Sequence, residues 1–125
     1  MGYESKIFVI EKSSYADIKE KLHFAPCIAM FDLGKMNYAG AFHKLFTSET
    51  ARNTMYYIYE GNEGLIKDCY DHELTEATLP ETIEALEKDL SVDYYRRISP
   101  VVTALKAYND NQKDWGELAV LHYGY

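Results

Sequence analysis

The densest group of side chains that could bind a metal lies at residues 68–73, which read Asp-Cys-Tyr-Asp-His-Glu. Carboxylates, a thiol and an imidazole are all zinc ligands, but a tight zinc site needs three or four ligands at suitable spacing and a second cluster elsewhere. His23 and Cys27 lie four residues apart and could supply that cluster, yet Pro26 between them breaks helical geometry. The favoured interpretation is therefore a chain without a metal or other cofactor.

No catalytic or phosphate-binding motif is present. The sequence lacks a Gly-x-Ser-x-Gly elbow, a P-loop and a dinucleotide-binding glycine fingerprint. The carboxylates of residues 68–73 do not mark an acid–base pair. These absences favour a protein that is not an enzyme and has no catalytic residue, and a deep pocket with converging polar groups would reverse that interpretation.

The two cysteines and His122 also have structural interpretations. A nucleophilic Cys27 or Cys69 would need a neighbouring histidine that promotes the thiolate. Both cysteines fall in apolar or half-apolar runs, which predicts two buried structural thiols rather than a disulfide. His122 falls in an apolar run that predicts a central strand, where a histidine is more often a core residue with satisfied hydrogen bonds than a catalyst.

The basic pair Arg96-Arg97 follows two aromatic residues, Tyr94 and Tyr95. Aromatic rings can stack on a base, and arginine can hold a phosphate in a bidentate manner. The alternative function is therefore a small-molecule or nucleotide-binding, sequestering protein that uses Tyr94, Arg96 and Arg97. The opposing structural interpretation is a helix with Tyr95 facing the core and both arginines in solvent.

Acidic charge is concentrated in one segment. The chain has 20 Asp and Glu against 13 Lys and Arg, for a net charge of −7. Residues 60–93 hold 11 acids and two bases, so this segment carries −9 and the rest of the chain +2. Such a surface attracts basic partners and repels nucleic acid, because phosphate binding needs Lys and Arg. The competing interpretation is a solvated face that only keeps the protein in solution.

Tyrosine is concentrated beside the same segment. The chain has 12 tyrosines, whose rings add contact area with little loss of rotamer entropy and so suit interfaces. The favoured function is a non-enzymatic interaction protein that binds a basic protein, one that normally holds nucleic acid being a natural partner. It would contact neither nucleic acid nor membrane, and a homodimer remains open. The predicted partner-binding residues are Tyr57, Tyr59, Glu60, Glu63, Asp68, Asp71, Glu73, Glu76, Glu84 and Glu87.

The patterning predicts one α+β domain over residues 1–125. We expect a mixed or antiparallel sheet of about four or five strands, with the N- and C-terminal strands central and adjacent, packed with about three or four helices. Strands are predicted at 6–11, 27–33, 54–60, 63–70 and 117–125, and helices at 14–23, from 78 onward, and at 92–109. Residues 34–38 predict a turn, and 39–53 are left open between loop and short helix.

Three local signals support these elements. Gly61-Asn62 predicts a two-residue hairpin turn, which would set Glu60 opposite Glu63 as an unfavourable like-charge pair. Residues 78–81, Thr-Leu-Pro-Glu, predict a helix start with a capping box. Pro100 indicates either a kink or a fresh helix capped by Ser99, and the second is favoured.

The apolar runs are short. None approaches the roughly 20 residues of a membrane helix, and residues 7–10 are too few for a signal peptide. We therefore expect a cytoplasmic protein whose thiols stay reduced.

The chain begins Met-Gly-Tyr-Glu-Ser-Lys-Ile-Phe-Val-Ile and ends Trp-Gly-Glu-Leu-Ala-Val-Leu-His-Tyr-Gly-Tyr. These two ends resemble small proteins encoded by phages and prophages of Gram-positive bacteria. The resemblance implies an accessory, anti-defence role in the cytoplasm of the bacterial host, such as inhibition of a defence nuclease by acidic mimicry or sequestration of a nucleotide signal. It carries over no functional residue.

Overall fold

The computed structural model describes residues 3–12, 23–92, 97–112 and 117–125. Its main sheet is antiparallel, with strand order β3-β1-β8-β7-β4. These strands are β1 (Ser5–Glu11), β3 (Cys27–Gly34), β4 (Arg52–Asn53), β7 (Thr75–Ala77) and β8 (Leu118–Gly124). A smaller sheet has the order β2-β5-β6, from β2 (His23–Phe24), β5 (Tyr56–Glu60) and β6 (Glu63–Leu65). The helices are α1 (Ala41–Thr47), α2 (Leu79–Val92) and α3 (Ile98–Asp110), which confirms the predicted α+β class.

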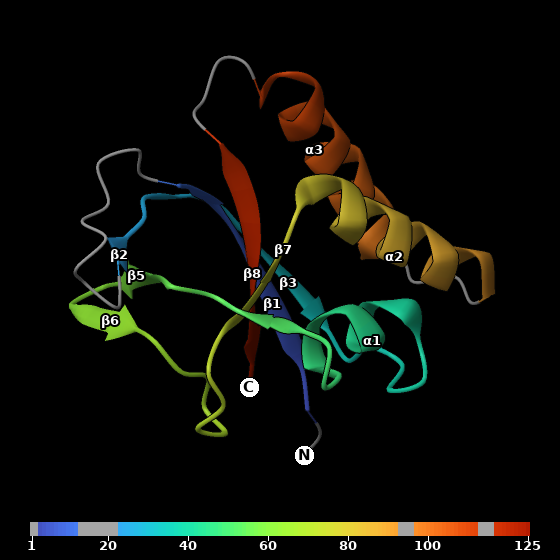
Figure 1. The fold of residues 1–125 in the computed structure, drawn as a ribbon. Helices are drawn as coiled ribbons and strands as arrows, with labels where there is room; N and C mark the ends of the chain where they lie inside the picture. The colour runs from blue at the N-terminus through green and yellow to red at the C-terminus, as the bar shows by residue number, and fades with distance from the viewer. Residues whose placement is uncertain (1–2, 13–22, 93–96, 113–116) are drawn as a thin grey trace.

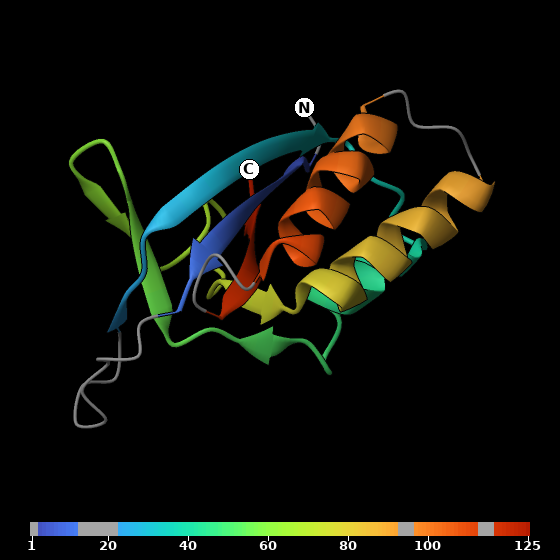
Figure 2. The ribbon, with the colours of Figure 1, turned by 90° about the horizontal axis from the view of Figure 1, so that it is seen from above.

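The main sheet is covered on both faces. Figure 2 shows α2 and α3 on one side and the β5–β6 hairpin on the other. Along β1, Ile7 and Val9 join the core beneath the helices, while Phe8 and Ile10 join a second core beneath the small sheet. A strand covered on both faces has apolar residues at every position, because successive side chains point to opposite sides.

The two terminal strands are central neighbours, as predicted. β1 pairs with β8 in antiparallel register from Ser5 opposite Gly124 to Glu11 opposite Leu118. This pairing brings the first described residues beside the C-terminus. Tyr125 accepts a hydrogen bond from the Glu4 N–H at 2.7 Å and donates its own N–H to Glu4 at 2.9 Å.

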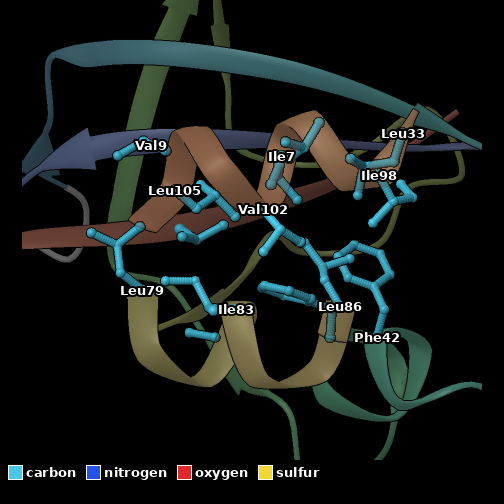
Figure 3. Packing of buried hydrophobic residues seen from close by; sticks show 14 of the residues in the cluster. Ile7, Val9, Leu33, Phe42, Leu79, Ile83, Leu86, Ile98, Val102 and Leu105 are labelled. Atoms are coloured by element: carbon cyan, nitrogen blue, oxygen red, sulfur yellow. The ribbon is translucent and has the colours of Figure 1, made fainter. Parts of the chain in front are cut away.

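The helix start predicted at residues 78–81 is confirmed as a capping box. The Glu81 N–H donates to Thr78 Oγ1 at 3.1 Å, and the Thr78 N–H donates to Glu81 Oε1 at 3.0 Å. Figure 3 shows the stripe of α2, labelled at Leu79, Ile83 and Leu86, packed against Val102 and Leu105 of α3. The cap and this apolar stripe together fix the rotation of α2.

The region around Pro100 forms a fresh helix, as favoured, but its predicted cap is wrong. α2 ends at Val92 and α3 begins at Ile98, with Arg97 at the N-cap position and no side-chain cap. Ser99 and Pro100 therefore both lie inside the first turn. Proline is tolerated there because the first N–H groups of a helix have no partner within it.

The β5–β6 hairpin has the predicted turn and register but a shorter return strand. Gly61 has a positive φ of 62°, and Glu60 pairs with Glu63 across the turn. β6 ends at Leu65 rather than near residue 70. The reason lies in residues 67–73, which close a turn of their own through a bridge between Lys67 and Glu73.

The predictions for residues 14–23 and for the two cysteines have different outcomes. The helix expected at 14–23 lies almost wholly outside the described residues, and His23 at its end belongs to β2. Cys27 and Cys69, predicted to be buried, are both exposed. Cys27 opens the edge strand β3 and Cys69 lies in the 67–73 turn, so their apolar sequence neighbours do not bury them. Among the described residues, no helix is both long and apolar enough to span a membrane.

Residues 39–53, left open by the sequence, contain the seven-residue helix α1. Its N-cap is Gly40, which has no side chain to accept the first N–H groups. Asp89 of α2 does so instead, because its carboxylate accepts from Ala41 at 2.7 Å and from Phe42 at 3.1 Å. A Cβ at Gly40 would lie 2.7 Å from Asp89 Oδ1, so glycine leaves room for this cap.

We predict that Asp89→Ala lowers the free energy of unfolding by about 2–3 kcal/mol, because it leaves two N–H groups without an acceptor. Asp89→Asn, which keeps one acceptor oxygen, should lose about half as much. Urea denaturation measures both. The control is Glu84→Ala, an exposed acid on the same helix, expected to change stability by less than about 0.5 kcal/mol. Equal losses in Asp89→Ala and Glu84→Ala would contradict the cap.

Candidate functional site

A cleft of about 550 Å³ opens at the end of the main sheet where the two chain ends meet. Figure 1 shows α1, the 67–73 turn and the end of β8 together at this end of the sheet. Tyr3 and Tyr38 line the cleft, as do the histidines His43 of α1 and His122 of β8. The remaining lining comes from the end of α1, the segment after it, β7 and the 67–73 turn.

Tyr3 is the centre of an aromatic cluster in this cleft. Its ring centroid lies 5.1 Å from that of Tyr70, 5.6 Å from that of His43, 6.1 Å from that of His122 and 6.2 Å from that of Tyr38. Burial raises the pKa of Tyr3, and the neighbouring Asp68 carboxylate raises it further. Tyr3 therefore keeps its phenolic proton at neutral pH.

Gly124 makes room for the Tyr3 ring. A Cβ at Gly124 would overlap the phenol ring and hydroxyl of Tyr3, since the ring lies directly on the β8 backbone. Gly124 ends β8, and Tyr3 lies two residues before β1, next to Glu4, which is hydrogen-bonded to Tyr125, so the sheet pairing holds the tyrosine at the cleft. This close approach requires glycine.

His122 is a buried core histidine with a hydrogen bond, as the sequence indicated. Ser5 Oγ lies 2.9 Å from its Nε2, and its ring stacks on Phe46 at a centroid distance of 5.4 Å. Burial lowers the pKa of His122 to about 3, and nearby His43 acts in the same direction. The imidazole is therefore neutral at pH 7, although the same side chain also lines the cleft.

His43 is buried on α1 and lies 5.0 Å from Tyr38 by ring centroids. Burial lowers its pKa, against the Asp89 carboxylate and the Met36 carbonyl, which both raise it. Its Nδ1 lies 3.4 Å from Thr47 Oγ1, whereas Nε2 has no hydrogen-bond partner among the described residues. The Met36 carbonyl is nevertheless near enough to raise the pKa of the ring, so the imidazole does not lack a polar neighbour.

The charged groups that line the cleft are all acidic. Glu49 follows α1, and Asp68 and Glu73 belong to the 67–73 turn, while the described lining contains no Lys or Arg. Asp68 Oδ1 accepts the N–H groups of Tyr70 at 2.9 Å and His72 at 3.0 Å, which holds the turn in place. Within the described chain, Glu49 and Glu73 make no ion pair.

The predicted partner-binding residues fall in several places. Tyr57, Tyr59 and Glu63 lie on the β5–β6 hairpin, while Glu84 and Glu87 lie on α2, across the main sheet from it. The strand backbone places Glu60 in the same hairpin. The structure therefore does not join the hairpin and α2 into one face.

Several of these acids have a lysine partner. Glu84 pairs with Lys88 at 3.1 Å and Glu87 with Lys106 at 3.5 Å. Glu76 of β7 is half-buried and pairs with Lys12, and exposed Asp71 pairs with Lys67. Of the predicted set, Asp68 and Glu73 line the cleft.

The sequence did not single out several cleft residues of clear chemical character, among them Tyr3, Tyr38, His43 and Glu49. The helical spacing of Phe42, Leu45 and Phe46 was the available signal, since a helix there buries His43 beside Phe42. Nothing in the sequence places Tyr3 against that helix, because the contact depends on the pairing of β1 with β8.

The alternative ligand site lies only partly within the described residues. Tyr94 and Arg96 fall outside them, and Arg97 is exposed beside Gly34 and Asp32. As for the metal hypothesis, no group of three or more His, Cys, Asp or Glu side chains in the described ranges could hold a metal ion. His23 is buried in β2, whereas Cys27 is exposed.

We predict that Gly124→Ala destabilises the protein by about 1–3 kcal/mol, because the new Cβ overlaps the Tyr3 ring. In a Tyr3→Ala background the same substitution should cost almost nothing. Denaturation of the four proteins of this double-mutant cycle measures the coupling. Gly64→Ala is the matched control, since its nearest neighbours lie at an ordinary 3.7 Å. Additive losses in the cycle would show that Tyr3 does not rest on Gly124.

We predict that His122 makes the protein less stable in acid. Its pKa is about 3 in the folded chain, against an ordinary value of 6.5 once the chain unfolds, so unfolding takes up a proton below about pH 6.5. Between pH 7 and pH 5, His122 should lower the free energy of unfolding by about 2 kcal/mol. His122→Gln, which can still bond Ser5, removes this share of the pH dependence. Identical slopes of unfolding free energy against pH in both proteins would contradict the prediction.

No protein family model matches the chain, and the searches of curated proteins and solved structures found no match either.

Proposed function

We propose that this protein is a non-enzymatic interaction protein that binds a basic protein through the acidic, tyrosine-lined cleft and its rim. The observation that carries the proposal is the charge of the cleft. Its lining contains three carboxylates, those of Glu49, Asp68 and Glu73, and no Lys or Arg among the described residues. Glu49 and Glu73 have no basic partner within the described chain, so their charge is available to a second molecule.

The two buried histidines of the cleft do not offset this negative charge. Burial lowers the pKa of both His43 and His122, so both rings are neutral near pH 7. A concave surface lined by one sign of charge focuses the field and raises the rate at which opposite charges arrive. The cleft therefore favours a cationic group and disfavours a phosphate.

The proposed partner is a protein whose surface normally holds nucleic acid. Such surfaces present Arg and Lys to phosphate groups, and a carboxylate-rich face competes for the same residues. The resemblance of the chain ends to phage and prophage proteins agrees with a host protein in this role. Exposed Tyr70, next to the cleft, adds apolar contact area of the kind found in interfaces.

Proton-transfer chemistry is poorly supported by the same cleft. A general acid or base works best when its pKa lies near the operating pH. The pKa of His122 is about 3 and that of Tyr3 is raised well above its ordinary value of 10. His122 Nε2 is also engaged with Ser5. These groups support binding rather than turnover.

We predict that Glu49→Lys with Glu73→Lys weakens binding of a short Arg- and Lys-rich peptide by about tenfold or more, because like charges then face each other. Fluorescence anisotropy of the labelled peptide measures its affinity. Binding by the natural protein should also weaken as salt is added, since exposed charges are screened.

The matched control carries the same change of charge elsewhere. Glu84→Lys with Glu87→Lys reverses two acids on α2, away from the cleft, and should reduce affinity by less than about threefold. An equal loss in both double variants would mean that net charge alone drives binding. Absence of peptide binding to the natural protein at low salt would reject the proposal.

A further inference from the structure

His43 is a buried polar side chain that the fold leaves incompletely satisfied. It is 3% exposed, lines the cleft, and has no hydrogen-bond partner for Nε2 among the described residues. The Thr47 hydroxyl donates to the His43 carbonyl at 2.6 Å and lies 3.4 Å from Nδ1, at the other side of the ring. Nε2 is itself buried and the Met36 carbonyl raises the pKa of this ring, so a group bound in the cleft meets the His43 ring beside Tyr3 and Tyr38 rather than a free nitrogen.

The cleft carboxylates come from two separate segments. Glu49 follows α1, whereas Asp68 and Glu73 come from the 67–73 turn, so the acceptors are distributed around the opening. Asp68 uses Oδ1 for two backbone N–H groups, and Glu73 and Glu49 make no ion pair in the described part of the chain. Several separated acceptors suit a donor whose N–H groups point in several directions.

Two tyrosine rings complete the wall. The centroids of Tyr3 and Tyr38 are 6.2 Å apart, with the ring planes inclined by 46°. Tyr38 is 69% exposed, so a face of this ring is open to a ligand. A cation within about 6 Å of a ring centroid is attracted to the aromatic face, and planar guanidinium groups also stack on it.

We infer that the cleft holds the guanidinium group of an arginine side chain from the basic partner, stacked on Tyr38 and surrounded by Glu49, Asp68 and Glu73. This inference rests on the proposed function and names the chemical group of the partner that the cleft recognises. Guanidinium fits better than ammonium because it is planar and presents five donors in a fork, whereas ammonium acts as a point charge. A cleft of about 550 Å³ accommodates such a group with its aliphatic stem.

The test titrates the whole chain with three single-residue probes: the N-acetyl amides of arginine, lysine and citrulline. Citrulline matches arginine in shape but lacks the charge. NMR follows the imidazole signals of His43 and His122. The arginine probe should shift both signals in a saturable manner, with citrulline at least about tenfold weaker and lysine about threefold weaker. Equal binding of citrulline, or tighter binding of lysine, would overturn the assignment to guanidinium.

Substitutions at Tyr38 locate the probe. Because this side chain is largely exposed, Tyr38→Ala should leave the fold intact and weaken the arginine probe about tenfold, while Tyr38→Phe retains the ring and the affinity. Tyr59→Ala, an exposed tyrosine on the hairpin, is the matched control and should have no effect. Equal affinity in Tyr38→Ala and the natural protein would overturn the stacking.

The two proposals fail in different ways. If the basic peptide binds but the arginine probe leaves both histidine signals unmoved, the proposed function stands and the arginine site is rejected. If the arginine probe binds in the cleft but the basic peptide binds no better than an acidic one, the site stands and the protein partner is rejected.

Discussion

The candidate site depends on one interaction: the Asp89 carboxylate of α2 caps the first turn of α1. A helix of seven residues is too short to be stable alone, and α1 has a glycine as its N-cap and no acid in its first turn. Asp89 lies 48 residues away in sequence from Ala41, which receives its shorter bond. Without this cap the helix that carries His43 and Phe46 into the cleft would lose its anchor.

The position of Asp89 follows from the packing of α2. The capping box at Thr78 and Glu81 sets where α2 begins, and the apolar stripe against α3 sets its rotation. Asp89 then lies on the side that faces α1, where it is buried without a salt bridge among the described residues. The charge is instead satisfied by the two N–H groups at the helix N-terminus, where a negative charge is favourable.

The second constraint is the pairing of the two chain ends. The adjacency of β1 and β8 places Tyr3 on Gly124 and His122 beside Ser5, so residues from opposite ends of the chain form one wall of the cleft.

The main sheet also keeps groups of acidic residues apart from one another. Its two faces separate the hairpin from α2, where Glu84 and Glu87 have lysine partners, whereas the cleft acids Glu49 and Glu73 have none in the described part of the chain.

Much of the fold was predictable because its signals are local. The capping box depends on four consecutive residues, and the hairpin register on the Gly61-Asn62 turn. The burial of both terminal strands was visible in their continuous apolar runs, since a strand covered on two faces shows no alternation. The exposed positions of Cys27 and Cys69 were not predictable, because an apolar run does not say which strand lies at a sheet edge.

The sequence by itself determined the fold class, the central strands and the concentration of acidic charge. Only the tertiary structure decided which acids stay unpaired and that Tyr3, Tyr38, His43 and His122 share one cleft. The reason is physical: local patterns record hydrogen bonds and burial within a few residues. The lining of the cleft instead comes from Tyr3 just before β1, from α1, from the 67–73 turn and from β8. These segments meet only when the sheet and helices pack.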